Sequence, residues 1–318
     1  MKAAIVHGRG QTPVYGDFPE PVAQAGEVML HVMAAALSPL TKTRASGSHY
    51  SSSGQYPAVA GVDGVGRTQD GRRLYFVSPR APFGGMAEQV AVRMEQCIPL
   101  PDGLDDVMAA AIANPGMSSC AALRERARLV PGERVLVNGA TGTAGRLAVQ
   151  MAKHMGAKKV VATGRDEKAL EELKTLGADG TISLLLPDDE LEAAFKEQFA
   201  GDGIDIVLDY LWGKSAATLI VAAAKAAKDE TPMRFVQIGS VSGNEISLPA
   251  AALRSSGLVL MGSGLGSVST RGLLSAIAVV MQAAAAGKLQ IKTETIPLAE
   301  VEKNWNKDSG QARVVFVL

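Results

Sequence analysis

The sequence predicts an α/β protein that contains a Rossmann-type doubly wound parallel sheet and a second, β-rich domain. The first supporting observation is the apolar run at residues 135–137, which has turn residues on both sides, as is typical of a strand buried on both faces. A Gly-rich turn and a helical period follow, because Leu147, Met151 and Met155 share one helix face. Residues 159–163 are predicted to form the next strand. Strand, helix and strand in this order form a βαβ unit, whose two strands run parallel.

The residues of the Gly-rich turn have separate predicted roles. Gly142 lets the backbone approach a pyrophosphate, and Gly145 lets the helix pack closely on the strand. The free N–H groups of Thr143, Ala144 and Gly145 then point at the anion from the helix N-terminus. Ala140 occupies the first position of the usual G-x-G-x-x-G motif, so a turn that binds nothing is the alternative. The strands on both sides of the turn favour dinucleotide binding.

The end of the second strand indicates which dinucleotide binds. NAD sites place an acidic residue there to hold the ribose 2′-hydroxyl, whereas a nearby Arg suits a 2′-phosphate. In this chain Gly164 stands at that position, and Arg165 and Lys168 supply two cations beside it. Asp166 could still reach a ribose, which keeps NAD as an alternative, and the two cations could form a solvated helix start. The pattern favours NADP(H).

Residues 1 to about 115 are predicted to be mostly β. Short strand-like runs are separated there by Pro and Gly, and no long helical period occurs before Asp105. Residues 46–54, SGSHYSSSG, are expected to form a polar, flexible loop. The expected strands cover residues 2–6, 28–34, 61–65, 73–77 and 87–92.

Helices and strands alternate from Asp105 to Gly262, which is the pattern of a doubly wound parallel sheet. Two short helices are expected within residues 105–127, with a break at Asn114-Pro115-Gly116. Further helices are expected at 167–176, 188–199 and 214–228, and further strands at 181–183, 204–209, 234–239 and 257–262. The remaining residues are expected to add a helix at 269–286, a strand at 293–297, a short helix at 298–306 and a final strand at 312–318.

The order of these elements predicts three segments. A substrate-binding domain covers residues 1–117, a dinucleotide-binding domain covers 118–262, and residues 263–318 return to complete the first domain. A cleft between the two domains is expected to face the C-terminal ends of the strands, where ligands bind in such sheets.

Composition excludes several classes of protein. The 318 residues carry 32 basic and 32 acidic side chains, so nothing suggests a nucleic acid or an anionic membrane as partner. Two cysteines, Cys97 and Cys120, are too few for a disulfide scaffold and suit a reducing compartment. The longest apolar segment, at 272–287, is shorter than a membrane span, and the N-terminus lacks a signal-peptide pattern. A cytoplasmic protein is expected.

A series of short motifs extends over essentially the whole chain. They are Gly26-Glu27-Val28, Leu37-Ser38-Pro39, Tyr56-Pro57, 61–66 (GVDGVG), 84–88 (GGMAE), 140–145 (ATGTAG), 176–179 (LGAD), 204–209 (IDIVLD) and Gln311-Ala312-Arg313. In this order and spacing they resemble the medium-chain dehydrogenase/reductase superfamily, specifically its zinc-free quinone-oxidoreductase-like branch. The resemblance implies a GroES-like catalytic domain beside a Rossmann-type NADP-binding domain.

The same resemblance bears on metal binding. Zinc-dependent relatives use a Cys in the first domain, a His-Glu pair after a Gly, and a further ligand before the cofactor domain. Here Ser38 lies at the first position, Val62-Asp63 replaces the pair, and Pro115 falls near the last. Because a zinc site needs three N, S or O ligands and only Asp63 qualifies, no metal site is expected.

Without a Lewis acid, an alcohol is hard to oxidise near neutral pH, because nothing lowers the pKa of its hydroxyl. The resemblance implies hydride transfer from NADPH to a quinone, an α,β-unsaturated carbonyl compound or an activated ketone. Tyr56 is expected to donate a hydrogen bond to the oxygen on which charge develops; the alternative is a packed side chain with its hydroxyl in water. Tyr50 is a competing donor, and Ser38 and Thr41 are either substrate contacts or turn residues.

The residues expected to bind the cofactor lie in the turn and near the ends of strands, with the nicotinamide near Ser119, Gly239 and Ser263. The full set is Thr141, Gly142, Thr143, Ala144, Gly145, Gly164, Arg165, Lys168, Ser119, Leu208, Ile238, Gly239 and Ser263.

Two other functions are alternatives on the sequence: a ketone or alcohol reductase with a protein proton relay, and an NADPH-binding redox sensor without turnover. A cofactor-oxidation assay separates the sensor from an enzyme. Comparing an enone with its saturated ketone tests the other alternative, because only the enone has a β-carbon that can accept hydride. A homodimer is also expected, in which the edge strand at 257–262 pairs with its twin.

Overall fold

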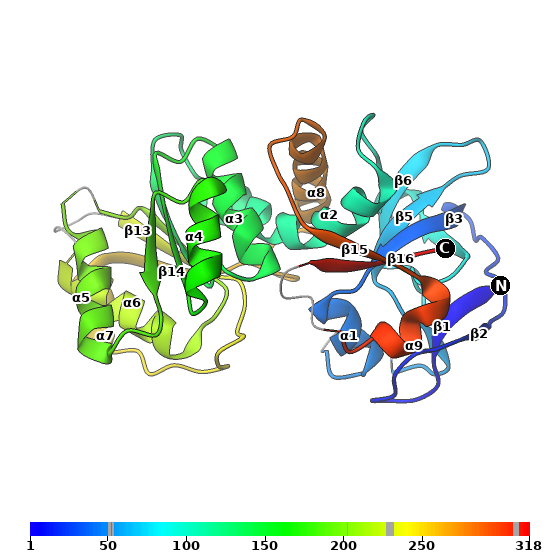
Figure 1. Cartoon of the computed structure of the whole chain (residues 1–318), viewed down its shortest axis with the longest axis horizontal. Coiled ribbons are helices and arrows are strands. Elements are labelled where there is room, and N and C mark those ends of the chain that lie inside the picture. Colours follow the sequence, from blue (N-terminus) through cyan, green and yellow to red (C-terminus); the bar gives the residue numbers. More distant parts are fainter. Residues whose placement is uncertain (50–51, 53, 202, 227–231, 308–311) are drawn as a thin grey trace. The chain divides into compact units, whose positions relative to one another are not determined.

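The computed structural model describes residues 1–49, 52, 54–201, 203–226, 232–307 and 312–318 (Figure 1). This part of the chain divides into two compact units: unit 1 contains residues 1–114 and 284–318, and unit 2 contains residues 115–283. The segment 263–318 is therefore shared between the units, and the expected boundaries at 117 and 262 stay a prediction. Tyr50, the expected competing donor in the loop at 46–54, lies outside the described residues.

Unit 2 is built on a parallel sheet, which has six strands in the described residues. The strand order is β11-β10-β9-β12-β13-β14, and every neighbouring pair is parallel. Numbered from β9, this order is 3-2-1-4-5-6, the order of dinucleotide-binding sheets. The strands are β9 (Arg134–Asn138), β10 (Lys159–Gly164), β11 (Gly180–Ser183), β12 (Ile206–Asp209), β13 (Pro232–Gln237) and β14 (Gly257–Gly262). The predicted Rossmann-type sheet is confirmed.

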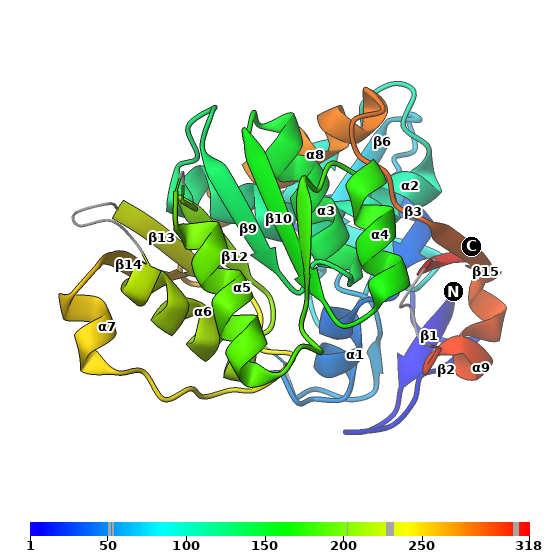
Figure 2. The ribbon, with the colours of Figure 1, turned by 60° about the vertical axis from the view of Figure 1, so that its left-hand side comes forward.

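Helices connect these strands and bury their apolar sides against the sheet. Phe195 of α5 and Leu219 of α6 belong to one buried cluster with Phe235 of β13, and α5 and α6 lie side by side in Figure 2. Burial of such large side chains stabilises each by about 1.5–3 kcal/mol. The helices are α3 (Thr143–His154), α4 (Glu167–Thr175), α5 (Asp188–Phe199), α6 (Gly213–Ala226), α7 (Ala250–Arg254) and α8 (Thr270–Ala285).

The expected break at Asn114-Pro115-Gly116 was wrong. One helix, α2 (Asp106–Ala121), continues through Pro115 and is followed by a π-helical segment, Ala122–Ala127. Pro disfavours helix interiors because it lacks an N–H. Residues 109–113, four alanines and Ile112, are buried here, and this packing outweighs the lost hydrogen bond. Gly116 serves close packing, because a Cβ there would lie 2.7 Å from Cγ1 of Val280 in α8.

Unit 1 is the predicted β-rich part. A small antiparallel sheet has the order β2-β1-β4, and a larger sheet has the order β15-β16-β3-β5-β6-β8, with β7 also paired to β3. β16 pairs antiparallel with β3, so the end of the chain completes a sheet begun near its start. The strands are β1 (Lys2–Val6), β2 (Val14–Asp17), β3 (Glu27–Ala36), β4 (Ala58–Val59), β5 (Asp63–Arg67), β6 (Arg73–Val77), β7 (Gln89–Arg93), β8 (Cys97–Pro99), β15 (Thr293–Pro297) and β16 (Arg313–Val317).

Helix α1 (Pro39–Ala45) of unit 1 was not predicted, although its signal is present in the sequence. Ser38 is the N-cap, and Pro39 occupies the first helical position, which suits proline. A second short helix, α9 (Val301–Asn304), lies before β16. No helix in the described part of the chain is long and apolar enough to cross a membrane.

Candidate cofactor and substrate sites

The Gly-rich turn between β9 and α3 leaves the start of a helix open. Gly142 is the N-cap residue of α3 and provides no side-chain cap. Among the described residues, no group accepts a hydrogen bond from the backbone N–H of Thr143, Ala144 or Gly145. Unpaired N–H groups at a helix N-terminus bind anions, because they add to the positive end of the helix dipole. The turn therefore leaves N–H groups of the helix start available to an anion, and phosphate binding there stays a prediction.

The space around Gly142 and Gly145 at this turn, and around Gly164 at the end of β10, explains why these residues are glycines. A Cβ on Gly142 would meet no atom within 4 Å, so the backbone there faces open space. A Cβ on Gly145 would lie 2.3 Å from the carbonyl oxygen of Gly139, which only the absence of a side chain permits. A Cβ on Gly164 would lie 2.3 Å from Cγ2 of Thr141. Gly145 and Gly164 thus serve packing, and Gly142 leaves room for a ligand.

A buried polar network holds the start of the turn in place, and the sequence reasoning missed it. Asn138 Nδ2 donates to Asp209 Oδ1 at 2.8 Å, and the N–H of Leu211 donates to the same oxygen at 3.1 Å. Thr163 Oγ1 donates to Asn138 Oδ1 at 2.8 Å and accepts from the N–H of Gly139 at 3.1 Å. Burial raises the pKa of the Asp209 carboxyl, and the bond from Asn138 opposes that rise. Polar residues at the ends of two buried strands were the available signal.

The ribose end of the site is formed by the residues after β10. The carboxylate of Asp166 accepts the N–H of Ala169 at 3.0 Å and caps α4, so this side chain is engaged in the helix. Arg165 and Lys168 are exposed, and within the described ranges neither forms an ion pair. This arrangement leaves two unpaired cations beside Gly164. It fits a 2′-phosphate better than a bare 2′-hydroxyl.

The remaining predicted cofactor residues fall into two groups. Ile238, Gly239 and Ser263 directly follow β13 and β14. They therefore lie at the carboxyl ends of the parallel strands, as the Gly-rich turn does. Ser119 and Leu208 are completely buried, and the Ser119 hydroxyl donates to the carbonyl of Gly116 at 3.0 Å. The structure thus places Ile238, Gly239 and Ser263 at the same end of the sheet as the Gly-rich turn, and it buries Ser119 and Leu208 inside unit 2. Cofactor contact stays a prediction for all five.

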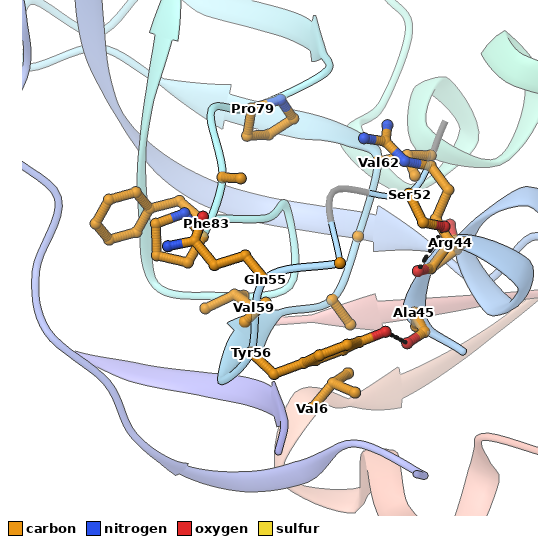
Figure 3. A pocket seen from close by; sticks show the side chains of 17 residues that line it. Val6, Arg44, Ala45, Ser52, Gln55, Tyr56, Val59, Val62, Pro79 and Phe83 are labelled. Atoms are coloured by element: carbon orange, nitrogen blue, oxygen red, sulfur yellow. Dashed lines mark hydrogen bonds between the residues drawn. The ribbon is translucent and has the colours of Figure 1, made fainter. Parts of the chain in front are cut away.

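A pocket in unit 1 contains two of the three predicted catalytic residues (Figure 3). Tyr56 and Thr41 line it, and Ser38 does not. The Tyr56 hydroxyl donates to the carbonyl of Ala45 at 3.3 Å, which is a long hydrogen bond. Tyr56 is partly buried, and its ring packs against the core of unit 1. The Tyr56 hydroxyl thus makes one long hydrogen bond, and its contact with a substrate stays a prediction.

Ser38 and Thr41 form the N-terminal cap of α1. Ser38 Oγ accepts the N–H of Thr41 at 2.8 Å, and the two hydroxyl groups lie 2.8 Å apart. Both side chains are buried. Their observed contacts are therefore those of a helix cap, and their contact with a substrate stays a prediction.

The chain is similar to several known proteins. A family profile described as "Zinc-binding dehydrogenase" matches residues 144–279. Over the full length of both chains, the sequence is 28% identical to the "Probable NADPH-dependent quinone reductase tdiC" of Emericella nidulans. The "Quinone oxidoreductase" of Rattus norvegicus is 31% identical over 209 residues, which cover 61% of this chain and 60% of the rat protein. The crystal structure of the quinone oxidoreductase from Thermus thermophilus superposes with a TM-score of 0.82 at 29% identity and covers both chains completely.

The chain belongs to the medium-chain dehydrogenase/reductase superfamily, in its quinone-oxidoreductase-like branch. The family profile matches only within unit 2, whereas the likeness to the structure from Thermus thermophilus extends over both units. The predicted membership and the predicted combination of a Rossmann-type sheet with a β-rich domain are confirmed.

In this quinone-oxidoreductase-like chain, Asp63 has structural partners. The Tyr75 hydroxyl donates to Asp63 Oδ2 at 2.7 Å, and both side chains are buried. Burial raises the pKa of the Asp63 carboxyl, and the Tyr75 hydroxyl and the positive charge of Arg313 oppose that rise. Nε of Arg313 is buried and has no hydrogen-bond partner in the part of the chain that the structure describes. Asp63 therefore accepts a buried hydrogen bond from Tyr75, and the positive charge of the buried Arg313 favours its carboxylate form.

The described residues contain no group of three or more His, Cys, Asp or Glu side chains that could hold a metal ion. At the positions expected of zinc ligands, Ser38 caps α1, Asp63 is bound to Tyr75, and Pro115 lies within α2. The side chains at these positions therefore do not form the donor set that zinc needs.

Replacing Asp63 by alanine is expected to lower the free energy of unfolding by about 1–3 kcal/mol, because the buried Tyr75 hydroxyl would lose its hydrogen-bond acceptor. Urea unfolding of the variant and of the original protein measures this difference. The control is Asp17→Ala, which removes an exposed carboxylate paired with Lys2 at 3.0 Å and is expected to cost at most about 1 kcal/mol. Equal effects of the two substitutions would contradict the role assigned to Asp63.

Proposed function

We propose that this protein is a zinc-independent reductase that transfers hydride from NADPH to a quinone or an α,β-unsaturated carbonyl compound. It is an NADPH-dependent reductase of the quinone-oxidoreductase type, in line with the names of its relatives from Emericella nidulans and Thermus thermophilus, both of which mention NADPH. The observation that carries the proposal is the uncapped start of α3, with open space at Gly142 and two unpaired cations at Arg165 and Lys168 among the described residues.

Unit 2 holds the cofactor. The backbone N–H groups of Thr143, Ala144 and Gly145 bind the pyrophosphate, and Arg165 and Lys168 bind the 2′-phosphate. Bound NADPH supplies the hydride. The network around Asn138 and Asp209 keeps these groups in place before the cofactor arrives. Preorganisation of this kind reduces the entropy that binding must offset.

Zinc independence directs the choice of acceptor. Without a metal to stabilise an alkoxide, the favourable acceptor is an electron-poor carbon whose negative charge spreads onto an oxygen after hydride addition. Quinones and enones both meet this requirement. The pocket of unit 1 suits such a molecule, because Val59, Val62 and Phe83 provide apolar walls and Tyr56 provides a hydroxyl donor.

Tyr56 donates a hydrogen bond to the oxygen that becomes negative. Tyr56→Phe is expected to lower kcat by about ten- to hundredfold, because a hydrogen bond to a charged group contributes about 1.5–3 kcal/mol. KM is expected to change by less than about threefold, because the bond strengthens mainly as charge develops. Steady-state kinetics with one quinone and one enone measure both parameters.

A matched control for this substitution is Tyr15→Phe. Tyr15 packs against the same core cluster as Tyr56 but does not line the pocket. Its hydroxyl should be dispensable, with kcat unchanged. Full turnover of Tyr56→Phe would remove Tyr56 from the mechanism and leave the proposed reaction without this donor.

The proposed reaction itself is tested by following NADPH absorbance with three acceptors: a quinone, an enone and the corresponding saturated ketone. Turnover of the first two, with the saturated ketone at least about a hundredfold slower in kcat/KM, is expected, since the ketone has no β-carbon that can accept hydride. Equal rates with the enone and the saturated ketone would support a carbonyl reductase instead. Binding of NADPH without turnover of any acceptor would support a sensor.

A homodimer is part of the proposal. β14 forms one edge of the parallel sheet, and Val259 and Leu260 on it are 47% and 37% exposed. An apolar edge strand with free backbone groups tends to pair with another strand. Light scattering at micromolar concentration should give a mass near twice 33.0 kDa. A monomer that persists at the highest measurable concentration would contradict the dimer.

A cytoplasmic location is also proposed. Cys97 and Cys120 are both unpaired, and burial raises the pKa of each thiol to about 11. Free, unreactive thiols suit a reducing compartment.

A further inference from the structure

The pocket of unit 1 contains a positive charge that the proposed reaction does not yet use. Arg44 is a residue of α1 and lines the pocket, and Figure 3 shows its guanidinium on the Val62 side, away from the Tyr56 hydroxyl. The side chain is half-buried, and burial lowers the pKa of the guanidinium. Because an arginine stays charged in proteins even so, the pocket carries a partly desolvated cation.

This cation has no partner within the described residues. No carboxylate lies within ion-pair distance of Arg44, and its guanidinium donates no hydrogen bond there. The described residues that line the pocket include no Asp and no Glu. Several other half-buried arginines of the chain do have a carboxylate partner: Arg73 with Asp106, Arg80 with Glu27, Arg134 with Asp205 and Arg234 with Glu133. Arg44 is thus positioned for an anion that the described part of the protein does not supply.

His49 does not add a second charge near this site. Burial lowers the pKa of its imidazole, and the positive charge of Arg44 lowers it further. At neutral pH the described lining of the pocket therefore carries one charge, that of Arg44, against apolar walls formed by Val59, Val62 and Phe83. A ligand that matches this surface is a small apolar skeleton with one anionic group.

We propose that Arg44 forms a carboxylate subsite and that the acceptor substrate of this reductase carries a carboxylate bound there. A planar guanidinium binds a carboxylate through two parallel hydrogen bonds, which fixes the ligand's orientation as well as its position. The acceptor gains hydride from NADPH at its β-carbon and a proton from solvent water at its α-carbon, while NADPH becomes NADP⁺ and the carboxylate is unchanged. This inference rests on the proposed function, because it names the acceptor of the same reaction.

The test uses two acceptors of the same length, (E)-4-oxopent-2-enoate and the neutral (E)-pent-3-en-2-one, with the original protein and with Arg44→Met. Loss of one partner of a desolvated charge pair is expected to lower kcat/KM for the carboxylate by at least about 30-fold. The neutral enone should change by less than about threefold, because it makes no charge contact. For each acceptor, the effect is the ratio of kcat/KM in the original protein to kcat/KM in Arg44→Met. Dividing the effect for the carboxylate by the effect for the neutral enone removes the difference in intrinsic reactivity between the two acceptors.

A binding measurement decides the subsite independently of turnover. Calorimetry with the protein saturated with NADP⁺ compares 4-oxopentanoate with pentan-2-one, and only the carboxylate should lose affinity in Arg44→Met. The variant should fold normally, because the Arg44 side chain makes no hydrogen bond among the described residues, and its melting temperature checks this. Lys42→Met is the control: Lys42 lies on the same helix but outside this pocket, so its loss should leave the carboxylate preference intact.

The outcomes separate this inference from the proposed function. Turnover of both enones with an equal effect of Arg44→Met on each would overturn the subsite and leave the reductase standing. Absence of turnover together with Arg44-dependent binding of 4-oxopentanoate would support the subsite and overturn the proposed reaction. Binding of 4-oxopentanoate that does not depend on Arg44 would overturn the subsite in either case.

Discussion

Gly142→Ala is expected to leave the fold intact and to weaken NADPH binding by about ten- to hundredfold. The φ of Gly142 is −77°, which alanine adopts without strain, and a Cβ there would meet no protein atom within 4 Å. The added methyl group would instead occupy the space through which a pyrophosphate approaches the backbone. Losing one hydrogen bond to the charged phosphate costs about 1.5–3 kcal/mol, which corresponds to this loss of affinity. Fluorescence titration with NADPH measures the change.

Two further glycines provide matched controls. A Cβ on Gly145 would lie 2.3 Å from a backbone oxygen, so Gly145→Ala should lower the melting temperature as well as the affinity. A Cβ on Gly180, at the start of β11, would meet no atom within 4 Å, so Gly180→Ala should change neither quantity. Unchanged NADPH affinity of Gly142→Ala would show that the pyrophosphate binds elsewhere.

Removing both cations after β10 is expected to abolish the preference for NADPH. In the double variant Arg165→Ser, Lys168→Ala, the Kd of NADPH should rise by about ten- to hundredfold, because charge-assisted contacts to the 2′-phosphate are lost. The Kd of NADH should change by less than about threefold, because its 2′-hydroxyl carries no charge. The two side chains are exposed and free of ion pairs in the described part of the chain, so stability should not change.

The salt dependence of binding gives a second readout for this pair. Exposed charge contacts are screened by salt, so NADPH binding to the original protein should weaken more steeply with ionic strength than binding to the double variant. Asp166→Ala tests the alternative that this carboxylate holds a ribose. Its observed role is to cap α4, so the expected loss is about 1 kcal/mol of stability with no change in cofactor preference. Weaker NADH binding in Asp166→Ala would contradict that assignment.

The sequence predicted unit 2 well because its signals are local and repeated. Strands β9, β10 and β12 are buried on both faces and appear as apolar runs, and each connecting helix shows its own period. The bounds of α5 and β14 agree with the predicted ranges 188–199 and 257–262. The open start of α3 was predictable from the Gly-rich turn alone, because the roles of these glycines depend on the local backbone geometry of the turn.

Other features depend on contacts that a local pattern does not contain. Pro115 normally ends a helix, but the packing of α2 keeps the helix continuous around it. Asn138 and Asp209 are 71 residues apart, and they meet because β9 and β12 are neighbours in the sheet. Arg44 resembles any surface arginine in the sequence. Its significance depends on burial beside apolar walls and on the absence of an acidic neighbour among the described residues.

The central claim is that hydride passes directly from NADPH to an electron-poor carbon of the acceptor. Its most direct test is turnover of (E)-pent-3-en-2-one with NADPH carrying deuterium at the transferable C4 position, followed by mass spectrometry and NMR of the product. The account predicts pentan-2-one with one deuterium atom at the former β-carbon. Deuterium on a carbinol carbon, or NADPH oxidation that leaves the enone unlabelled, would contradict it.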